Sequence, residues 1–301
     1  MLGGPTGVGK SAAALELAVG LEREGVSALL VSADSRQIFR GFDIGTDKVA
    51  ATVREAHPHV GIDVTEADNP YTLYDWLATV RAALDGASGL AIVVGGTGLY
   101  QRGLLRGFLP GGSRPSDPAV RARLEEQLAA GGREPLDLQL RALNPAAAAA
   151  TVTASPRRLV RTLEIAVLGG DPLARDESPW PAPWHYALLD QPDHGRHREA
   201  LAARIERQFA DGLVDEAVRL AARLLPGTPA LSGIGYGEAL RLHAGEIDAT
   251  RARHEAFSRT WAYARRQRTW YRAEPIGTVL AAGEEGKGLV AIARSLLEQA
   301  R

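Results

Sequence analysis

The sequence predicts an α/β fold, in which a parallel sheet is flanked by helices and carries a helical insertion. The first observation is a glycine-rich segment at residues 3–11 that leads directly into a helical pattern at Ser11–Arg23. The second is the alternation of short apolar runs with helical segments in the first third of the chain, which indicates parallel strands joined by helical crossovers. The third is a change after Pro115, where helical segments follow one another without a strand between them.

The expected elements are placed by hydrophobic period and by breaker residues. Strands are expected at 28–32, 60–64, 90–94, 185–189 and 276–280. Helices are expected at 11–23, 71–84, 117–130, 134–143, 156–168 and 288–300, at 194–225 with a break near Gly212, and at 236–272 with a break at Gly245. Residues 169–184, rich in Pro, Gly and Trp, are expected to form a loop. We therefore expect a core from residues 1–114 and 185–301, and a helical insertion at 115–184.

Composition indicates an ordinary soluble protein. Of the 301 residues, 45% are hydrophobic and 24% are charged, which is enough to build a core. The absence of cysteine excludes disulfides and thiolate metal sites. The N-terminus lacks the pattern of a secretory signal, and no apolar stretch approaches the roughly 18 residues needed to cross a bilayer. We expect a cytoplasmic protein without membrane contact, with a monomer as the simplest assembly.

Positive charge is concentrated near the C-terminus, although the net charge is only −1. Between Arg241 and Arg272 there are eight arginines and three acidic residues. Such a segment fits either a solvated helix face or a surface that meets nucleic-acid phosphates. Charge alone leaves both interpretations open.

Residues 4–11, Gly-Pro-Thr-Gly-Val-Gly-Lys-Ser, have the GxxxxGK[ST] spacing of a phosphate-binding loop, and a helix follows directly. Glycines let backbone amides turn toward phosphate oxygens, and the helix N-terminus adds partial positive charge. Lys10 would reach the terminal phosphate and the Ser11 hydroxyl would bind Mg²⁺, so the loop predicts a P-loop NTPase-like sheet. Only residues 1–3 precede the loop, so its central strand is expected to be truncated or missing.

The acidic residue of the predicted site does not follow the strand that usually carries it in P-loop NTPases. In P-loop NTPases a later strand usually ends in an Asp that holds Mg²⁺, but strand 90–94 ends in Gly95-Gly-Thr97, which argues against a motor or switch NTPase. Asp34 instead follows strand 28–32, at the carboxyl end where open α/β sheets bind ligands. From position alone, Asp34 could be a general base, a metal ligand or a helix cap.

Four motifs extend this pattern along the chain. They are the loop at 4–11, Asp34-Ser-Arg-Gln-Ile-Phe39, Gly41-Phe-Asp-Ile-Gly-Thr-Asp-Lys48 and Gly95-Gly-Thr-Gly-Leu-Tyr100. In order and spacing they resemble those of tRNA dimethylallyltransferases, also called tRNA isopentenyltransferases. Later segments at 116–121, 233–236 and 264–270 are similar to the same family, so the resemblance spans about residues 3–275.

The resemblance implies transfer of a dimethylallyl group from dimethylallyl diphosphate to N6 of the adenosine immediately 3′ of the anticodon, with Mg²⁺ as cofactor and no need for ATP. It implies that Asp34 is the general base and that Thr97 helps to hold the reacting groups. Both roles suit the chemistry, because a weakly nucleophilic amine benefits from a carboxylate that accepts its proton. The resemblance also implies diphosphate binding by Gly4, Thr6, Gly7, Gly9, Lys10 and Ser11.

The same resemblance implies contacts with the tRNA anticodon loop, whose target base must leave its stack to react. The residues expected to contact tRNA are Ser35, Arg36, Gln37, Arg158, Arg161, Arg265, Arg266 and Gln267. Arg36 and Gln37 could instead form a solvated turn. Trp76 and Tyr100 are expected to pack in the core, and His57, His59 and His185 to be structural or surface residues.

The sequence departs from the family at several positions. The family usually has Arg-Ile-x-x-Arg in the helix after the returning strand, where the second Arg helps to bind the prenyl diphosphate, but Gln208 stands there and Arg207 comes one residue earlier. A shift of one residue rotates a helical side chain by about 100°. Residues 152–155 and Trp261 also replace family residues.

Two alternatives remain open at this point. A small-molecule or nucleoside kinase would bind ATP in the loop and use Asp34 to activate a hydroxyl. A catalytically impaired tRNA-binding homologue would keep the fold without transfer, as Gln208 and the short first strand permit.

Overall fold

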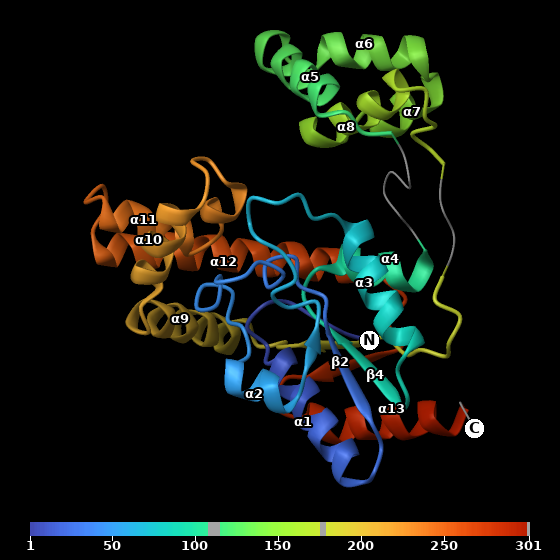
Figure 1. Cartoon of the computed structure of the whole chain (residues 1–301), viewed down its shortest axis with the longest axis vertical. Helices are drawn as coiled ribbons and strands as arrows, with labels where there is room; N and C mark the ends of the chain where they lie inside the picture. Colours follow the sequence, from blue (N-terminus) through green and yellow to red (C-terminus); the bar gives the residue numbers. More distant parts are fainter. Residues whose placement is uncertain (108–114, 175–178, 300–301) are drawn as a thin grey trace. The chain divides into compact units, whose positions relative to one another are not determined.

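Six parallel strands form one sheet in the order β3-β2-β4-β1-β5-β6, and strands β2 and β4 of this sheet are labelled in Figure 1. The computed structural model describes residues 1–107, 115–174 and 179–299. The strands are β1 (Leu2–Gly3), β2 (Ala28–Ser32), β3 (His59–Val60), β4 (Leu90–Val94), β5 (Ala187–Asp190) and β6 (Thr278–Ala281). The predicted α/β fold with a parallel P-loop-type sheet is therefore confirmed, and strands 28–32 and 90–94 have the expected bounds.

The strand expected at residues 60–64 is wrong beyond Val60. Gly61 has a φ of +86° and Asp63 a φ of +54°, and both lie in the left-handed region, which ends an extended strand. Gly61 is required there, because a Cβ would lie 2.8 Å from the Ser32 carbonyl oxygen. The chain consequently leaves the sheet after two residues, His59 and Val60.

The central strand, which was expected to be truncated or missing, is present and is only two residues long. Leu2 pairs with Val94 on one side and with Ala187 on the other. The Gly95 amide donates to the Leu2 carbonyl at 3.2 Å. Two residues suffice because both neighbouring strands bond to them and because Leu2 is buried in the core below the sheet.

The sheet is covered on both faces. α1 (Lys10–Arg23) and α13 (Glu285–Gln299) pack on one face, where alanines and leucines of α1 form the core with β1, β2, β4 and β5. α3 (Leu73–Asp85), α4 (Gly98–Arg106) and the end of α12 (Ala249–Tyr271) lie over the other face (Figure 1). Trp76 and Tyr100 stack at 4.7 Å between ring centroids, and both are buried, which confirms their predicted core packing.

Beside the sheet, a second core joins α9 (His194–Ala210), α10 (Leu213–Arg223), the 3₁₀ turn η1 (Pro229–Ser232), α11 (Tyr236–His243) and α12. The predicted breaks occur where Gly212 and Gly245 adopt φ values of +99° and +72°. This core also buries Phe42 from the segment after β2. That contact fixes a long connection, which includes the short helix α2 (Ala51–Ala56), beside the carboxyl edge of the sheet. Neither α2 nor α4 was predicted.

The chain divides into two compact units, Met1–Leu105 with Trp180–Arg301, and Arg106–Pro179. The sequence placed these boundaries at 114 and 184 instead, and residues 108–114 lie outside the described residues. The second unit contains α5 (Pro118–Gly131), α6 (Glu134–Leu143), α7 (Pro145–Thr151) and α8 (Pro156–Val167). Side chains of Asp117, Asn144 and Ser155 cap three of them.

The unpredicted helix α7 is an alanine run capped by Asn144, so it offers no amphipathic period to read. The described residues between 169 and 184 form no helix or strand, as expected for a loop, while residues 175–178 lie outside the described residues. Residue 300, the predicted end of the last helix, lies outside them as well. None of the helices described in this chain is long and apolar enough to cross a bilayer.

Candidate active site

The phosphate-binding loop connects β1 to α1 and has the backbone shape that its glycines predict. Gly4 has a φ of +148°, and a Cβ there would run into the Leu189 carbonyl. Gly7 has a φ of +81°, and a Cβ would run into the Leu201 side chain. Lys10 begins α1 and folds back so that its Nζ donates to the Pro5 carbonyl at 2.6 Å. The loop therefore curls around its own lysine, at a helix N-terminus suited to anions.

A cavity of about 200 Å³ lies against this loop. Five of the predicted diphosphate ligands line it, namely Thr6, Gly7, Gly9, Lys10 and Ser11. Gly4, the sixth, does not line it and lies against the Leu189 carbonyl. Asp34 and Asp47 add carboxylates to the lining, and Arg204 adds a second cation.

Lys10 is almost fully buried at this cavity, with 9% of its surface exposed. Burial lowers the pKa of Lys10 to about 8, and Arg204 contributes in the same direction, whereas Asp34 and Asp190 act in the opposite direction. An ammonium so poorly solvated gains more from an incoming anion than an exposed lysine does.

Asp34 stands just beyond β2, and its carboxylate is fixed by its own turn. Asp34 Oδ1 accepts from the Arg36 amide at 2.8 Å, which leaves Oδ2 without a hydrogen-bond partner in the part of the chain that the structure describes. Thr97 braces the same turn from the end of β4, because its Oγ1 accepts from the Ser35 amide at 3.0 Å. Residues 35–38 form turns, so Asp34 does not cap a helix. The remaining interpretations are a general base or a metal ligand.

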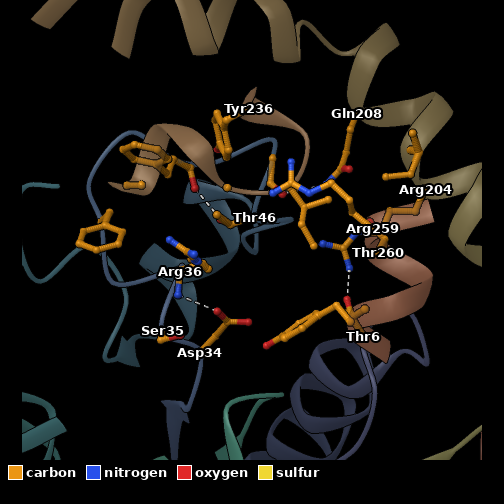
Figure 2. A pocket seen from close by; sticks show the side chains of 18 of the residues that line it. Thr6, Asp34, Ser35, Arg36, Thr46, Arg204, Gln208, Tyr236, Arg259 and Thr260 are labelled. Atoms are coloured by element: carbon orange, nitrogen blue, oxygen red, sulfur yellow. Dashed lines mark hydrogen bonds between the residues drawn. The ribbon is translucent and has the colours of Figure 1, made fainter. Parts of the chain in front are cut away.

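A second, wider cavity of about 360 Å³ also has Asp34 in its lining (Figure 2). Figure 2 shows Asp34, Ser35 and Arg36 coming from one segment, with Thr6 and Arg204 facing them. The wall is partly apolar and partly basic, with Phe39, Phe42, Ile205, Ala230, Ile234, Tyr236, Arg259 and Arg266 among its residues. The two cavities share Thr6, Asp34, Thr46, Arg204 and Tyr263 as lining residues. Asp34 is therefore where an anion site meets a site large enough for a flat organic group.

Sequence reasoning assigned no site role to three of these shared residues, Thr46, Arg204 and Tyr263. Arg204 on α9 donates from Nη1 to Thr6 Oγ1 at 2.9 Å, and its Nε lies 3.5 Å from Asp47 Oδ2. Tyr263 on α12 lies beside Asp34, and burial together with that carboxylate raises the pKa of Tyr263 to about 12. Its hydroxyl is therefore protonated at neutral pH and able to donate. Arg204 stood inside the helix motif that was compared with the family, whereas no local signal marked Tyr263.

Two glutamines predicted to contact tRNA have other partners. Gln267 is buried, its Oε1 accepts from the Thr6 amide at 2.8 Å, and its Nε2 donates to the Gly96 carbonyl at 2.9 Å. Gln37 is buried as well and bonds Ser32 Oγ at 3.0 Å and the Thr46 carbonyl at 3.2 Å. Both side chains tie the loops of the site together through these hydrogen bonds. Any tRNA contact by the two glutamines stays a prediction.

The predicted arginines differ in where they lie. Arg36 and Arg266 are exposed at the wider cavity, and Arg265 is exposed outside its lining. In the second unit Arg158 is exposed, whereas Arg161 donates to the buried Glu164 at 2.8 Å and to the Pro115 carbonyl at 3.1 Å. Arg161 therefore stabilises its own unit, and any tRNA contact by these five arginines stays a prediction.

Gln208 occupies the position where the family usually has arginine. Its Nε2 donates to the Ile44 and Gly45 carbonyls at 2.9 and 3.2 Å, so it supports the segment that carries Thr46. Arg207 lines neither of the two cavities and instead borders a hollow near Lys48 and Arg54. As expected from the helical rotation, Arg207 does not replace the missing guanidinium.

Comparisons with known proteins agree with this geometry. A sequence profile of the family described as IPP transferase matches residues 37–274. A tRNA dimethylallyltransferase of Salinispora arenicola is 41% identical over 96% of this chain and 83% of its own length. That of Thermobifida fusca is 37% identical over 90% and 86%.

Solved structures show the same fold. The full-length tRNA isopentenylpyrophosphate transferase from Bacillus halodurans superposes with a TM-score of 0.66 at 27% identity, covering 99% of this chain and 96% of that one. A eukaryotic dimethylallyltransferase acting on tRNA gives a TM-score of 0.80 at 20% identity, over 99% of this chain and 79% of that one.

Proposed function

Because this chain belongs to the tRNA dimethylallyltransferase family, we propose that it transfers a dimethylallyl group from dimethylallyl diphosphate to N6 of the adenosine 3′ of the anticodon in tRNA. The observation that carries the proposal is the meeting of two cavities at Asp34. The smaller one, around Lys10, suits a diphosphate. The wider one, with aromatic and aliphatic walls, suits an unstacked purine next to the prenyl group.

Each of the two cavities serves a different part of the reaction. N6 forms a bond to the allylic carbon, the C–O bond to the diphosphate breaks, and its electron pair leaves with the diphosphate. The amine proton passes to the free Oδ2 of Asp34, which the Arg36 amide and the Thr97 brace hold at the junction. Lys10 and the loop amides stabilise the charge that accumulates on the leaving group.

Magnesium fits the oxygen donors at the phosphate cavity. The Ser11 hydroxyl and the Asp34 and Asp47 carboxylates line it, and Mg²⁺ favours one or two carboxylates together with phosphate oxygens and water. Across the described ranges, no three His, Cys, Asp or Glu side chains gather as a ready metal site, so the diphosphate would complete the ligand set. Bound through Ser11, the ion would neutralise charge on the departing diphosphate.

The basic side of the wider cavity is where tRNA would enter. Arg36, Arg259 and Arg266 line this cavity, and all three come from the sheet-containing unit. Guanidinium groups in such a setting pair with phosphates around a base that has left its stack. We assign the RNA-contacting role to this edge, with dimethylallyl diphosphate on the loop side.

The test is a transfer assay without ATP. The purified protein is incubated with dimethylallyl diphosphate, Mg²⁺ and unmodified tRNA bearing adenosine 3′ of the anticodon, and the nucleosides are weighed by mass spectrometry. A prenylated adenosine is expected, and a tRNA with guanosine at that position is the control. Formation of ADP in a parallel reaction with ATP, without any prenylated nucleoside, would favour a kinase instead.

A further inference from the structure

Thr6 is held through three of its groups by side chains that are distant in sequence. Its amide donates to Gln267 Oε1 at 2.8 Å, and its Oγ1 accepts from Arg204 at 2.9 Å. Its carbonyl oxygen lies 2.8 Å from Nε2 of His197, a residue of the first turns of α9 that the sequence did not single out. Because Thr6 borders both cavities, whatever fixes Thr6 also fixes the geometry of the site.

The environment of His197 determines which of its nitrogens carries the proton. Arg268 Nη2 lies 2.8 Å from His197 Nδ1, and a guanidinium can only donate. Nδ1 therefore accepts, and the neutral ring carries its proton on Nε2, which donates to the Thr6 carbonyl. Arg268 is itself held by Asp190 at the end of β5, through Nε at 3.0 Å. The result is a partly buried chain of hydrogen bonds that runs from Asp190 at the sheet edge, through Arg268 and His197, to the phosphate-binding loop.

The ring is enclosed as well as bonded. His197 is fully buried, and its centroid lies 5.5 Å from that of Trp261 in an edge-on arrangement. Trp261 is a position at which this chain departs from the family pattern, and Arg268 also lies over its face, 5.8 Å from the centroid. Burial lowers the pKa of His197, and the positive charges of Arg268 and Lys10 act in the same direction, whereas the Thr6 carbonyl and Asp190 act in the opposite direction. The ring is therefore neutral at neutral pH.

The Thr6 carbonyl belongs to the same peptide group as the Gly7 amide. A trans peptide is planar, so its C=O and N–H point in opposite directions. A hydrogen bond that holds the carbonyl toward His197 therefore aims the Gly7 N–H away from α9, and Gly7 borders the phosphate cavity. The His197 hydrogen bond thus selects the peptide orientation that an anion-binding loop needs.

We propose that His197 is a positioning residue for diphosphate binding, which acts by donating from Nε2 to the Thr6 carbonyl within the Asp190–Arg268–His197 chain. It touches no substrate and acts through the loop. The proposal rests on the proposed function only in its link to the prenyl donor, since diphosphate binding can be measured directly.

The test compares two substitutions that differ in one hydrogen bond. In His197→Asn the side-chain oxygen can take the place of Nδ1 and accept from Arg268, but the shorter side chain has no donor that reaches the Thr6 carbonyl. In His197→Gln the longer amide can serve both partners. His194→Asn is the matched control, because His194 is exposed, lies on the same helix and meets the same Trp261 at 5.8 Å without contacting the loop.

The Kd for inorganic diphosphate with Mg²⁺ is measured by calorimetry, alongside the KM for dimethylallyl diphosphate, the Kd for tRNA and the melting temperature. His197→Asn should raise the diphosphate Kd and the donor KM by about 3- to 10-fold, the range of one neutral hydrogen bond. His197→Gln should stay within about 2-fold of the wild type, with tRNA affinity unchanged in both. A lower melting temperature with unchanged diphosphate affinity would show a purely structural residue and overturn the proposal.

A measurement on the unaltered protein covers the case in which His197→Asn does not fold. Histidine ¹⁵N NMR should show His197 with a protonated Nε2 and an unprotonated Nδ1, and its signals should shift when inorganic diphosphate binds. A doubly protonated or Nδ1–H ring at neutral pH would contradict the geometry. If the wild type forms no prenylated adenosine but the diphosphate measurements behave as expected, the proposed function fails while the role of His197 stands.

Discussion

The two cavities that meet at Asp34 are built in different ways. The phosphate cavity takes most of its chemistry from one continuous loop, residues 4–11, whose shape is set by its glycines. The wider cavity takes single residues from the segment after β2, from α9, from the turn near Ala230 and from α12. The phosphate cavity therefore tolerates little change in the backbone of its loop. The wider cavity depends instead on how separate elements pack against one another. The predictions that follow test this contrast at the junction and on each side.

The largest effect is expected at the junction. Asp34→Asn keeps an oxygen that can accept from the Arg36 amide, so the turn is preserved while the base is lost. Turnover should fall by about 10²- to 10⁴-fold, with the Kd for diphosphate unchanged within about 2-fold. Single-turnover rates and calorimetry check both parts. Near-normal turnover would remove Asp34 from the role of general base and leave it as a contributor to metal binding.

The affinity of the phosphate cavity for diphosphate should depend on pH because of Lys10. Burial lowers its pKa to about 8, so below that pH the ammonium is present, and above it the free protein loses the charge that attracts diphosphate. The Kd for dimethylallyl diphosphate should therefore rise with pH above about 8, approaching tenfold per unit. The titration is repeated with Lys10→Gln, which should remove this rise and leave only the ionisation of the ligand. An identical profile in both proteins would assign the pH dependence elsewhere.

A neighbouring pair of arginines tests the acceptor side. Arg266 lines the wider cavity, whereas the adjacent Arg265 is exposed outside it. Arg266→Ala should raise the KM for tRNA by about 10- to 30-fold, at the lower end of the range for a hydrogen bond to a charged group because Arg266 is exposed, and leave the donor KM unchanged. Arg265→Ala should have the smaller effect of a peripheral phosphate contact. Equal losses in the two variants would indicate general electrostatic attraction in place of contact at the cavity.

The same contrast explains how far the sequence could be interpreted. The loop at 4–11, Asp34 and Thr97 were predictable because each lies in a short motif at the end of a strand, where backbone geometry dictates position. The bonds of Gln267 to the phosphate-binding loop and to Gly96 were not predicted, since its arginine-rich neighbours marked a surface but not which side of α12 is buried. Tyr263 and His197 were missed because their roles come from contacts across about 70 to 230 residues of sequence, which no local period reveals.

The fold shows a related limit. Strands 28–32 and 90–94 were predicted with the bounds that the structure gives them, whereas β5 and β6 begin two residues later than expected. β1 was expected to be truncated or missing, because only residues 1–3 precede the loop. Its strand character comes from β4 and β5 on either side, which is tertiary information. The helix α7 escaped prediction for the opposite reason, because a uniform alanine run has no polar face.

The smallest effect is expected at Tyr263, which lies beside Asp34 and lines both cavities. Because its pKa is raised to about 12, the hydroxyl stays protonated through the working range and acts only as a hydrogen-bond donor or acceptor. Tyr263→Phe removes that hydroxyl and keeps the ring that faces Arg266, so kcat should fall by about 2- to 10-fold without loss of folding. The decrease should be independent of pH between 6 and 9, roughly three units below that pKa. A loss that grows with pH would show that Tyr263 exchanges a proton during the reaction. Proton transfer at the junction of the two cavities would then involve a residue of α12 as well as Asp34 after β2.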